Sequence, residues 1–391
     1  MKTCSRPWGT PPAVSDVVIR HVASPLLLRI WGIIPWWSPG QKTGGRFSMK
    51  AHCSFPVIYQ RMVILLALLS VAFCVENLVL RQHTALQQAG DSAVGEGAPM
   101  VLCFQEVTDL MMALGSILGL VLLRRGLARH NLLGSPKAML VGYAKRERLL
   151  DAWSHVTGKE APFLIATWVL AIASRANAPT SVEASSVVLP LSETVRNFIS
   201  ICVFAFVSGL FLALTLSVQH VVNLLPMMVD AFCFHFVHRP CLDDNIRDWG
   251  LLQAALRRAS NAVERCFLVV ETVTLITVLI GVTAMALTPM QPVVHLWLLV
   301  AALLVAFVEA RLFFRSAEVT EKCQRVPSLV NSMCFGSNVD PDRHYLVEYV
   351  TYSAAGFYVF QVRLTAAMAI KLAYVSGLLA FAVVTNIASK W

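Results

Sequence analysis

The sequence is poor in charge for its length. Of its 391 residues only 14% are charged, whereas 57% are hydrophobic. A soluble domain has about a quarter of its residues charged, so this composition excludes an ordinary soluble globular protein. A net charge of +9 would suit a nucleic-acid partner, but in a membrane protein it usually reflects basic cytoplasmic loops. We therefore expect no nucleic acid among the partners.

The sequence also lacks the common signatures of enzymes. It contains no G-x-x-x-x-G-K phosphate loop, H-E-x-x-H, G-x-S-x-G or C-x-x-C pair. The strongest candidate metal site is "CFHFVHRPC", Cys233 to Cys241, but on a helix its cysteines do not readily join the face of His235 and His238. We favour a helix that ends before Pro240. We predict that the chain is not an enzyme and uses neither a metal nor a cofactor.

Features of a secreted domain are missing as well. Met1 to Gly40 shows no continuous apolar core with a cleavage site, and the sequence has no N-x-[ST] acceptor. No cysteine lies clearly in a predicted outer loop, so we expect no structural disulfide. The first apolar span is then expected to act as its own insertion signal.

Long apolar runs dominate what the sequence does contain. About 20 apolar residues cross a bilayer as a helix, and seven segments are candidates. An all-α integral membrane protein with seven transmembrane helices is therefore predicted. The third span is the shortest and is expected to borrow a turn beyond Pro162. The seven spans are Val57–Leu80, Val101–Leu123, Ala161–Ser174, Phe198–Gln219, Cys266–Leu287, Val293–Phe314 and Leu364–Thr385.

The basic residues predict the orientation. With a cytoplasmic N-terminus, 27 lysines and arginines lie in inner segments and four in outer ones, which follows the positive-inside rule and puts the C-terminus outside. The inner segments are long and partly helical in pattern, so a cytoplasmic helical anchor region is expected. The predicted parts are a cytoplasmic segment (1–56), helices one to six with cytoplasmic extensions (57–314), the anchor segment (315–363), and helix seven with a short tail (364–391).

Acidic residues inside spans are costly and tend to be functional. Glu106 and Asp109 share a helix face. They are expected either to line an outer cavity that attracts cations or amines, or to pair with Arg81 or Arg175 near the boundary. In the same span, "GSILG" provides a G-x-x-x-G pattern that permits close helix approach.

The last span contains a lysine, Lys371, roughly 10 Å from the inner boundary of the membrane at about 1.5 Å per helical residue. Glu271 and Glu309 lie at a similar level in spans five and six, so an ion pair within the subunit is predicted. The opposite side of this helix carries a stripe of mostly small residues, which suits either tight packing or the wall of a narrow conduit. The stripe comprises Ala366, Ala373, Gly377, Ala380 and Val384.

Three segments resemble the insect-type gustatory and odorant receptor superfamily. "AAGFYVF" and "AYVSGLLAF", at Ala354–Phe360 and Ala373–Phe381, are similar to its C-terminal signature, and "PLLLRIWGIIP" at Pro25–Pro35 is similar to an element before its first span. The inverted seven-span topology agrees with this resemblance. Ala380 stands where the superfamily has a polar amide, and Gly377 where it often has a bulkier aliphatic residue.

The resemblance implies a gustatory-type receptor that is a ligand-gated, non-selective cation channel. Such receptors are usually tetramers of identical or related subunits in the plasma membrane of sensory neurons. The expected partners are a small-molecule tastant or odorant, membrane lipid and monovalent cations, with divalent cations as a further candidate. The pore is expected along helix seven, with Phe381 and Val384 as its narrowest ring. The predicted pore and gate residues are Ala373, Gly377, Ala380, Phe381 and Val384.

The ligand is expected in the outer half of the helix bundle. The candidate ligand residues are acidic or aromatic and lie at outer or middle depth in the spans. They are Glu106, Asp109, Trp168, Phe204, Phe206 and Trp297. Two alternatives keep the same topology. One is a polytopic transporter, although no internal repeat is visible. The other is a non-conducting receptor or scaffold.

Overall fold

The structure is a computed structural model. It describes residues 54–91, 98–130, 132, 139–177, 193–238, 241–287, 292–332 and 341–388. The predicted element at Pro25–Pro35 lies outside these residues. The described chain is helical except for one two-stranded hairpin, which confirms the all-α class. Its elements are α3 (Ser54–Asp91), α4 (Ala98–His130), α5 (Met139–Arg146), α6 (Leu150–Ala176), α7 (Glu193–His238), α8 (Leu242–Leu287), α9 (Pro292–Ser332), α10 (Pro341–Tyr352), β1 (Tyr358–Val359), β2 (Val362–Arg363) and α11 (Ala366–Ala388).

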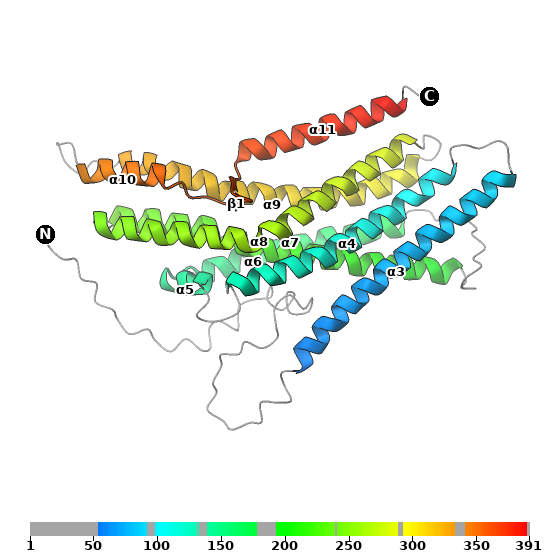
Figure 1. The fold of residues 1–391 in the computed structure, drawn as a ribbon, viewed down its shortest axis with the longest axis horizontal. Coiled ribbons are helices and arrows are strands. Elements are labelled where there is room, and N and C mark those ends of the chain that lie inside the picture. The colour runs from blue at the N-terminus through cyan, green and yellow to red at the C-terminus, as the bar shows by residue number, and fades with distance from the viewer. Residues whose placement is uncertain are drawn as a thin grey trace.

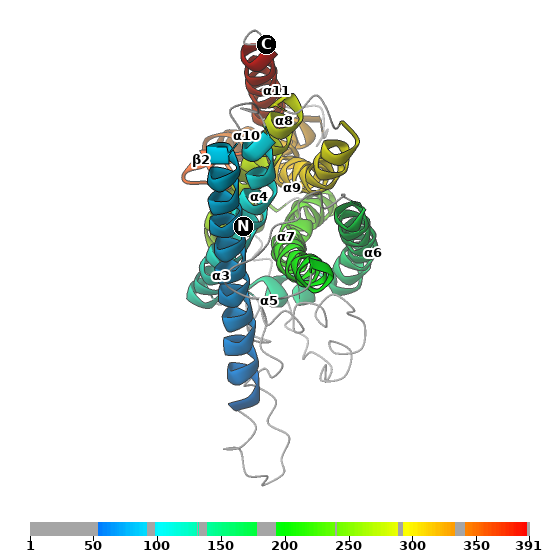
Figure 2. The same ribbon diagram turned by 90° about the vertical axis from the view of Figure 1, so that its right-hand side faces the viewer.

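The long helices form one elongated bundle (Figure 1). α3 lies obliquely against α4, α7 packs with α6, α8 and α9, and α11 lies on the outside along α8 and α9. Figure 2, turned by 90°, shows α11 at the edge of the bundle. We name the two ends by their residues. The Arg175 end holds the last turns of α6 and α8, and the α10 end holds α10 and the last turns of α7 and α9.

Several helices are much longer than a bilayer is thick. α7 and α8 have 46 residues each, or about 69 Å at 1.5 Å per residue, against a hydrocarbon core of about 30 Å. The inner segments that the sequence predicted as partly helical are thus continuous with the spans. α7 ends at His238, before Pro240 as predicted.

Five of the described helices are long and apolar enough to cross a membrane. They contain the first five predicted spans. The third span extends beyond Pro162 as expected, and by more than the one turn expected, because α6 begins at Leu150. The sixth predicted span lies in α9 and the seventh in α11, where the apolar stretch Ala366–Leu379 is shorter. Five of the seven predicted spans are therefore found among the described residues, and the sixth and seventh stay predictions.

The helices α4 and α8 are in close contact along their length. A Cβ added at Gly115 would lie 2.5 Å from Cγ2 of Val273, and one at Gly126 would lie 1.9 Å from the carbonyl oxygen of Ala262. The predicted close-approach role of the G-x-x-x-G pattern is confirmed, and Gly126 extends it by two turns. Only glycine lets these two backbones approach so closely.

The segment between α10 and α11 contains the resemblance motif Ala354–Phe360 and forms the hairpin of β1 and β2. Phe360 and Gln361 both have positive φ, 46° and 68°, as a two-residue hairpin turn of type I′ requires. Neither residue favours that conformation. The backbone N–H groups of Phe357 and Phe360 donate to Thr320 Oγ1 of α9 and Glu264 Oε2 of α8, each at 3.1 Å. The hairpin is therefore fixed to the bundle, and α11 starts from it.

Candidate functional site

One of the predicted ligand residues, Asp109, takes part in a buried ion pair at the Arg175 end. Asp109 lies on α4 and Arg175 in the last turn of α6, and Nη2 of Arg175 donates to Oδ2 of Asp109 at 2.9 Å. Both side chains are buried, with 7% and 11% exposed. The pairing of Asp109 with Arg175, one of two expectations from the sequence, is confirmed. It joins α4 to α6.

Aromatic residues of α6 and α7 adjoin this pair. The Phe204 ring lies 5.8 Å from the Cζ atom of Arg175, within cation–π range. Two helical turns before Arg175, Trp168 donates its indole N–H to the carbonyl oxygen of Ala205 at 3.1 Å and to Oγ of Ser208 at 3.2 Å. Asp109 and Phe204 thus meet around one guanidinium, and Trp168 fixes α6 to α7 beside them.

The other three predicted ligand residues are less closely grouped. Glu106 is buried one turn before Asp109 on α4. Phe206 is half-buried against the main core. Trp297 is 37% exposed on α9. Sequence reasoning weighed Arg175 only as a boundary partner for an acid. Its place at the end of an apolar span was the signal that could have marked it as a site residue.

The guanidinium of Arg175 is only partly satisfied. Its Nη2 is bonded to Asp109, whereas its buried Nε and Nη1 atoms have no hydrogen-bond partner among the described residues. Buried polar groups are nearly always hydrogen-bonded. The Arg175 end therefore contains a fixed cation with spare donors.

A second buried polar group contains the predicted acids. Glu309 of α9 is 1% exposed, and Thr215 of α7 donates its hydroxyl to Glu309 Oε1 at 2.5 Å. Glu271 of α8 has a buried oxygen, Oε1, and neither it nor Glu309 Oε2 has a hydrogen-bond partner in the described chain. These acids are thus held by the bundle helices and not by α11.

The structure does not bring Lys371 to either acid. The Lys371 side chain is exposed on α11, and no ion pair of Lys371 forms among the described residues. α11 is anchored near its start, where Leu364 and Ala369 are buried, and its next turns face outward. The predicted pair within one subunit is therefore not formed in the single chain, because this part of α11 does not turn its lysine toward α8 and α9.

The predicted pore residues also lie on this outward helix. Ala373, Gly377 and Phe381 are exposed, and a Cβ added at Gly377 would meet nothing within 4 Å. The side chains of Ala380 and Val384 are outside the described ones. Exposed apolar side chains occur on both sides of the stripe, so α11 has an uncovered apolar surface. They include Ile370, Tyr374, Leu378 and Phe381 on one side and Leu372 and Leu379 on the other.

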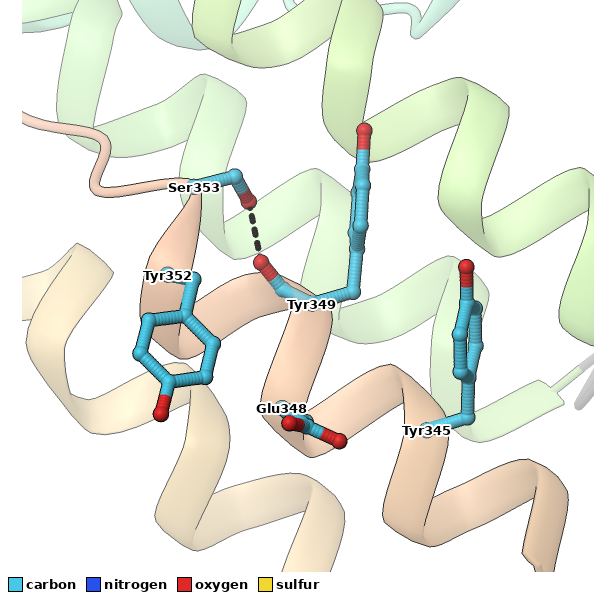
Figure 3. Close-up of a pocket in the computed structure, with 5 residues that line it drawn as sticks. All are labelled: Tyr345, Glu348, Tyr349, Tyr352 and Ser353. Carbon is cyan, nitrogen blue, oxygen red and sulfur yellow. Dashed lines mark hydrogen bonds between the residues drawn. The ribbon is translucent and has the colours of Figure 1, made fainter.

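An open hollow of about 450 Å³ lies at the α10 end, where the sequence predicted no site. Figure 3 shows Tyr345 and Tyr349 with their rings side by side on α10, and the Ser353 hydroxyl bonded to the Tyr349 carbonyl oxygen. Ser353 Oγ also accepts the indole N–H of the buried Trp249 at 2.8 Å. Glu348 and Tyr352 complete the lining. The hollow lies at the opposite end of the bundle from Arg175.

The described molecule is thus a multi-pass bundle of apolar helices with one helix standing outside it. Its fold resembles the insect olfactory receptor OR5 from Machilis hrabei, with a TM-score of 0.59, 14% sequence identity, and 92% of this chain and 96% of that chain covered. OR5 in complex with eugenol is also similar, with a TM-score of 0.56, 14% identity, and 93% and 97% covered. A scan against protein-family models finds no match, and a search of curated proteins finds no similar sequence.

The chain therefore has the fold of an insect olfactory receptor. The resemblance drawn from three short motifs is confirmed at the level of fold, over more than nine-tenths of both chains. The solved structures that it resembles are olfactory receptors, and the absence of enzymatic activity in this chain stays a prediction.

Proposed function

We propose that this chain is a chemoreceptor subunit of the gustatory type that assembles into a tetramer and acts as a ligand-gated, non-selective cation channel. The observation that carries the proposal is α11. It is tied to the bundle at its base and exposes apolar side chains on both sides of its small-residue stripe. An uncovered apolar helix needs lipid or further copies to cover it. Four copies of α11 around one axis would cover the stripe side.

In this arrangement the pore is lined by Ala373, Gly377, Ala380, Phe381 and Val384. Small side chains would leave the pore wide, so Phe381, the largest of these five side chains and 66% exposed in the single chain, is the candidate for a closed hydrophobic ring. Such a ring gates by excluding water, and its dilation lets ions pass. The conducted ions would be monovalent cations, with divalent cations as a further candidate.

The proposed ligand is a small tastant or odorant bound at the Arg175 end, among Glu106, Asp109, Trp168, Phe204, Phe206 and Trp297. This region joins α4, α6 and α7 through the Asp109–Arg175 pair and the Trp168 bonds. A ligand that changes the packing of these helices can shift the closed and open populations only by its difference in affinity for them. The N-terminus and the 315–363 segment would lie in the cytosol. The receptor itself would lie in the plasma membrane of a sensory neuron.

The decisive experiment is agonist-evoked current from the purified full chain in a planar bilayer. Eugenol is a suitable first probe, because a receptor of the same fold has been solved with it. We expect cation current with little selectivity, and we expect Phe381→Ala to raise the current without agonist by an order of magnitude or more. Val375→Ala, an exposed apolar residue outside the stripe, is the matched control and should leave that current unchanged.

Two outcomes contradict the proposal. A folded protein that binds eugenol but never conducts would instead support a non-conducting receptor, scaffold or transporter. Equal effects of Phe381→Ala and Val375→Ala would show that the stripe does not line the pore.

A further inference from the structure

Arg175 presents hydrogen-bond donors that the protein itself leaves unused. One of its nitrogen atoms, Nη2, is bonded to Asp109 at 2.9 Å, while Nε and Nη1 are buried with no partner among the described residues. The side chain is 93% buried, since 7% of it is exposed. A guanidinium carries only donors, so what completes this site must be an acceptor.

Three features hold the guanidinium in place. Arg175 lies in the last turn of α6, where the helix dipole favours a cation. Asp109 of α4 supplies the opposite charge, and the Phe204 ring of α7 lies 5.8 Å from Cζ. A buried, paired arginine loses little further freedom when it donates to another group, because its planar fork is already oriented.

The charges around the site select the kind of acceptor. Two buried acids, Glu106 and Asp109, lie one turn apart on α4, and Arg175 is the cation that the described residues place on Asp109. An added anion would meet both acids, whereas a neutral carbonyl or ester oxygen can accept from the spare N–H groups without that repulsion. Phe204 adds an aromatic surface beside them.

We infer that Arg175 determines ligand specificity, by donating to a neutral oxygen acceptor on a small, otherwise apolar ligand. This inference rests on the proposed function, because it concerns the same ligand site. It adds a chemical class that is narrower than tastant or odorant: ketones, aldehydes and esters in preference to hydrocarbons and to carboxylates of the same size. A site that must leave donors unpaired discriminates strongly against a ligand that lacks the acceptor.

Three probes of one shape test the inference. Acetophenone carries a neutral carbonyl, ethylbenzene has no acceptor, and benzoate is an anion. Binding to the purified full chain in detergent is measured by microscale thermophoresis, with no need for current. We expect acetophenone to bind at least tenfold more tightly than either of the other two probes.

Variants assign the preference to Arg175. Arg175→Lys keeps the charge opposite Asp109 but loses the fork, and should reduce the ratio of acetophenone to ethylbenzene affinity to below threefold. Because a lone change can unfold a buried pair, the double variant Asp109→Leu with Arg175→Met removes both charges and should show the same loss. Arg196→Lys is the matched control, since the Nε and Nη2 of Arg196 are already bonded to Oδ1 of Asn77, at 3.0 and 2.7 Å. It should leave the ratio unchanged.

The possible failures separate this inference from the proposed function. A wild-type ratio near one, benzoate binding as tightly as acetophenone, or an unchanged ratio in both Arg175 variants would overturn the role of Arg175, even in a chain that conducts. A chain that shows the expected ratios but carries no current under any agonist would leave the role of Arg175 intact and overturn the channel.

Discussion

The contact between α4 and α8 and the helix α11 are opposite solutions to the same problem of placing an apolar helix. Along the first, Gly115 and Gly126 let two backbones meet with no room for a Cβ atom. Along the second, Gly377 meets nothing within 4 Å, and Phe381 keeps 66% of its surface exposed. A glycine in a membrane helix therefore has no single meaning. In α4 it lets two helices of one chain meet, and in α11 it lies on a surface that the described residues leave uncovered.

The largest expected effect tests the buried side of this comparison. A Cβ at Gly126 would lie 1.9 Å from the carbonyl oxygen of Ala262 and 2.9 Å from its carbonyl carbon, both backbone atoms that cannot rotate away. We expect Gly126→Ala to push α4 from α8 and to cost about 3 kcal/mol or more of folding free energy. Chemical unfolding of the purified protein in detergent measures this cost.

Gly158→Ala is the matched control for this change. Gly158 lies inside α6 with nothing within 4 Å of an added Cβ, so alanine should stabilise the helix by roughly 0.5–1 kcal/mol. Equal effects of the two substitutions would show that α4 and α8 are not in close contact.

An intermediate effect is expected at the hairpin, where the two regions join. Thr320 Oγ1 accepts the backbone N–H of the buried Phe357 at 3.1 Å and would lie 2.8 Å from a Cβ at Gly356. Thr320→Val keeps the shape but leaves that N–H without its acceptor, at a cost of about 1–3 kcal/mol. We expect α11 to be released before the rest of the bundle, seen as faster hydrogen exchange of Leu364 and Ala369.

The control for this change is Thr351→Val. The hydroxyl of Thr351 is exposed and donates only within α10, to the carbonyl oxygen of Val347. Exchange at Leu364 and Ala369 should stay as in the wild type. Faster exchange throughout the bundle in Thr320→Val would mean that the hairpin stabilises the whole fold and not α11 in particular.

The two regions also differ in how far the sequence could predict them. The pattern at Gly115 and Gly119 was sufficient to predict a close contact, because a small-residue face is a property of one helix. The Asp109–Arg175 pair was one of two stated alternatives, since the end of a span limits which acid an arginine can reach. The extension of the third span beyond Pro162 was expected, because proline is often tolerated in membrane helices; only the length of the extension, to Leu150, was underestimated.

The failure at Lys371 has a different cause. Depth along a helix follows from counting residues, and it put Lys371 level with Glu271 and Glu309. The direction in which a side chain points depends on how its helix is anchored. α11 is anchored by a hairpin with two residues at positive φ, Phe360 and Gln361. Neither residue type signals such a turn, so no pattern in the sequence could have given the direction of α11.

The smallest effect is expected at Lys371 itself, and it tests whether α11 is complete in one chain. Because Lys371 is exposed and unpaired among the described residues, Lys371→Met should change the folding free energy of the protomer by less than about 1 kcal/mol. Chemical unfolding in detergent at low protein concentration measures this.

A loss of about 3 kcal/mol or more that appears only in assembled protein would show that a neighbouring subunit supplies an acid to Lys371. A large loss in the isolated protomer, recovered by adding Glu309→Gln, would instead restore the ion pair within one subunit and require α11 to rotate against α8 and α9.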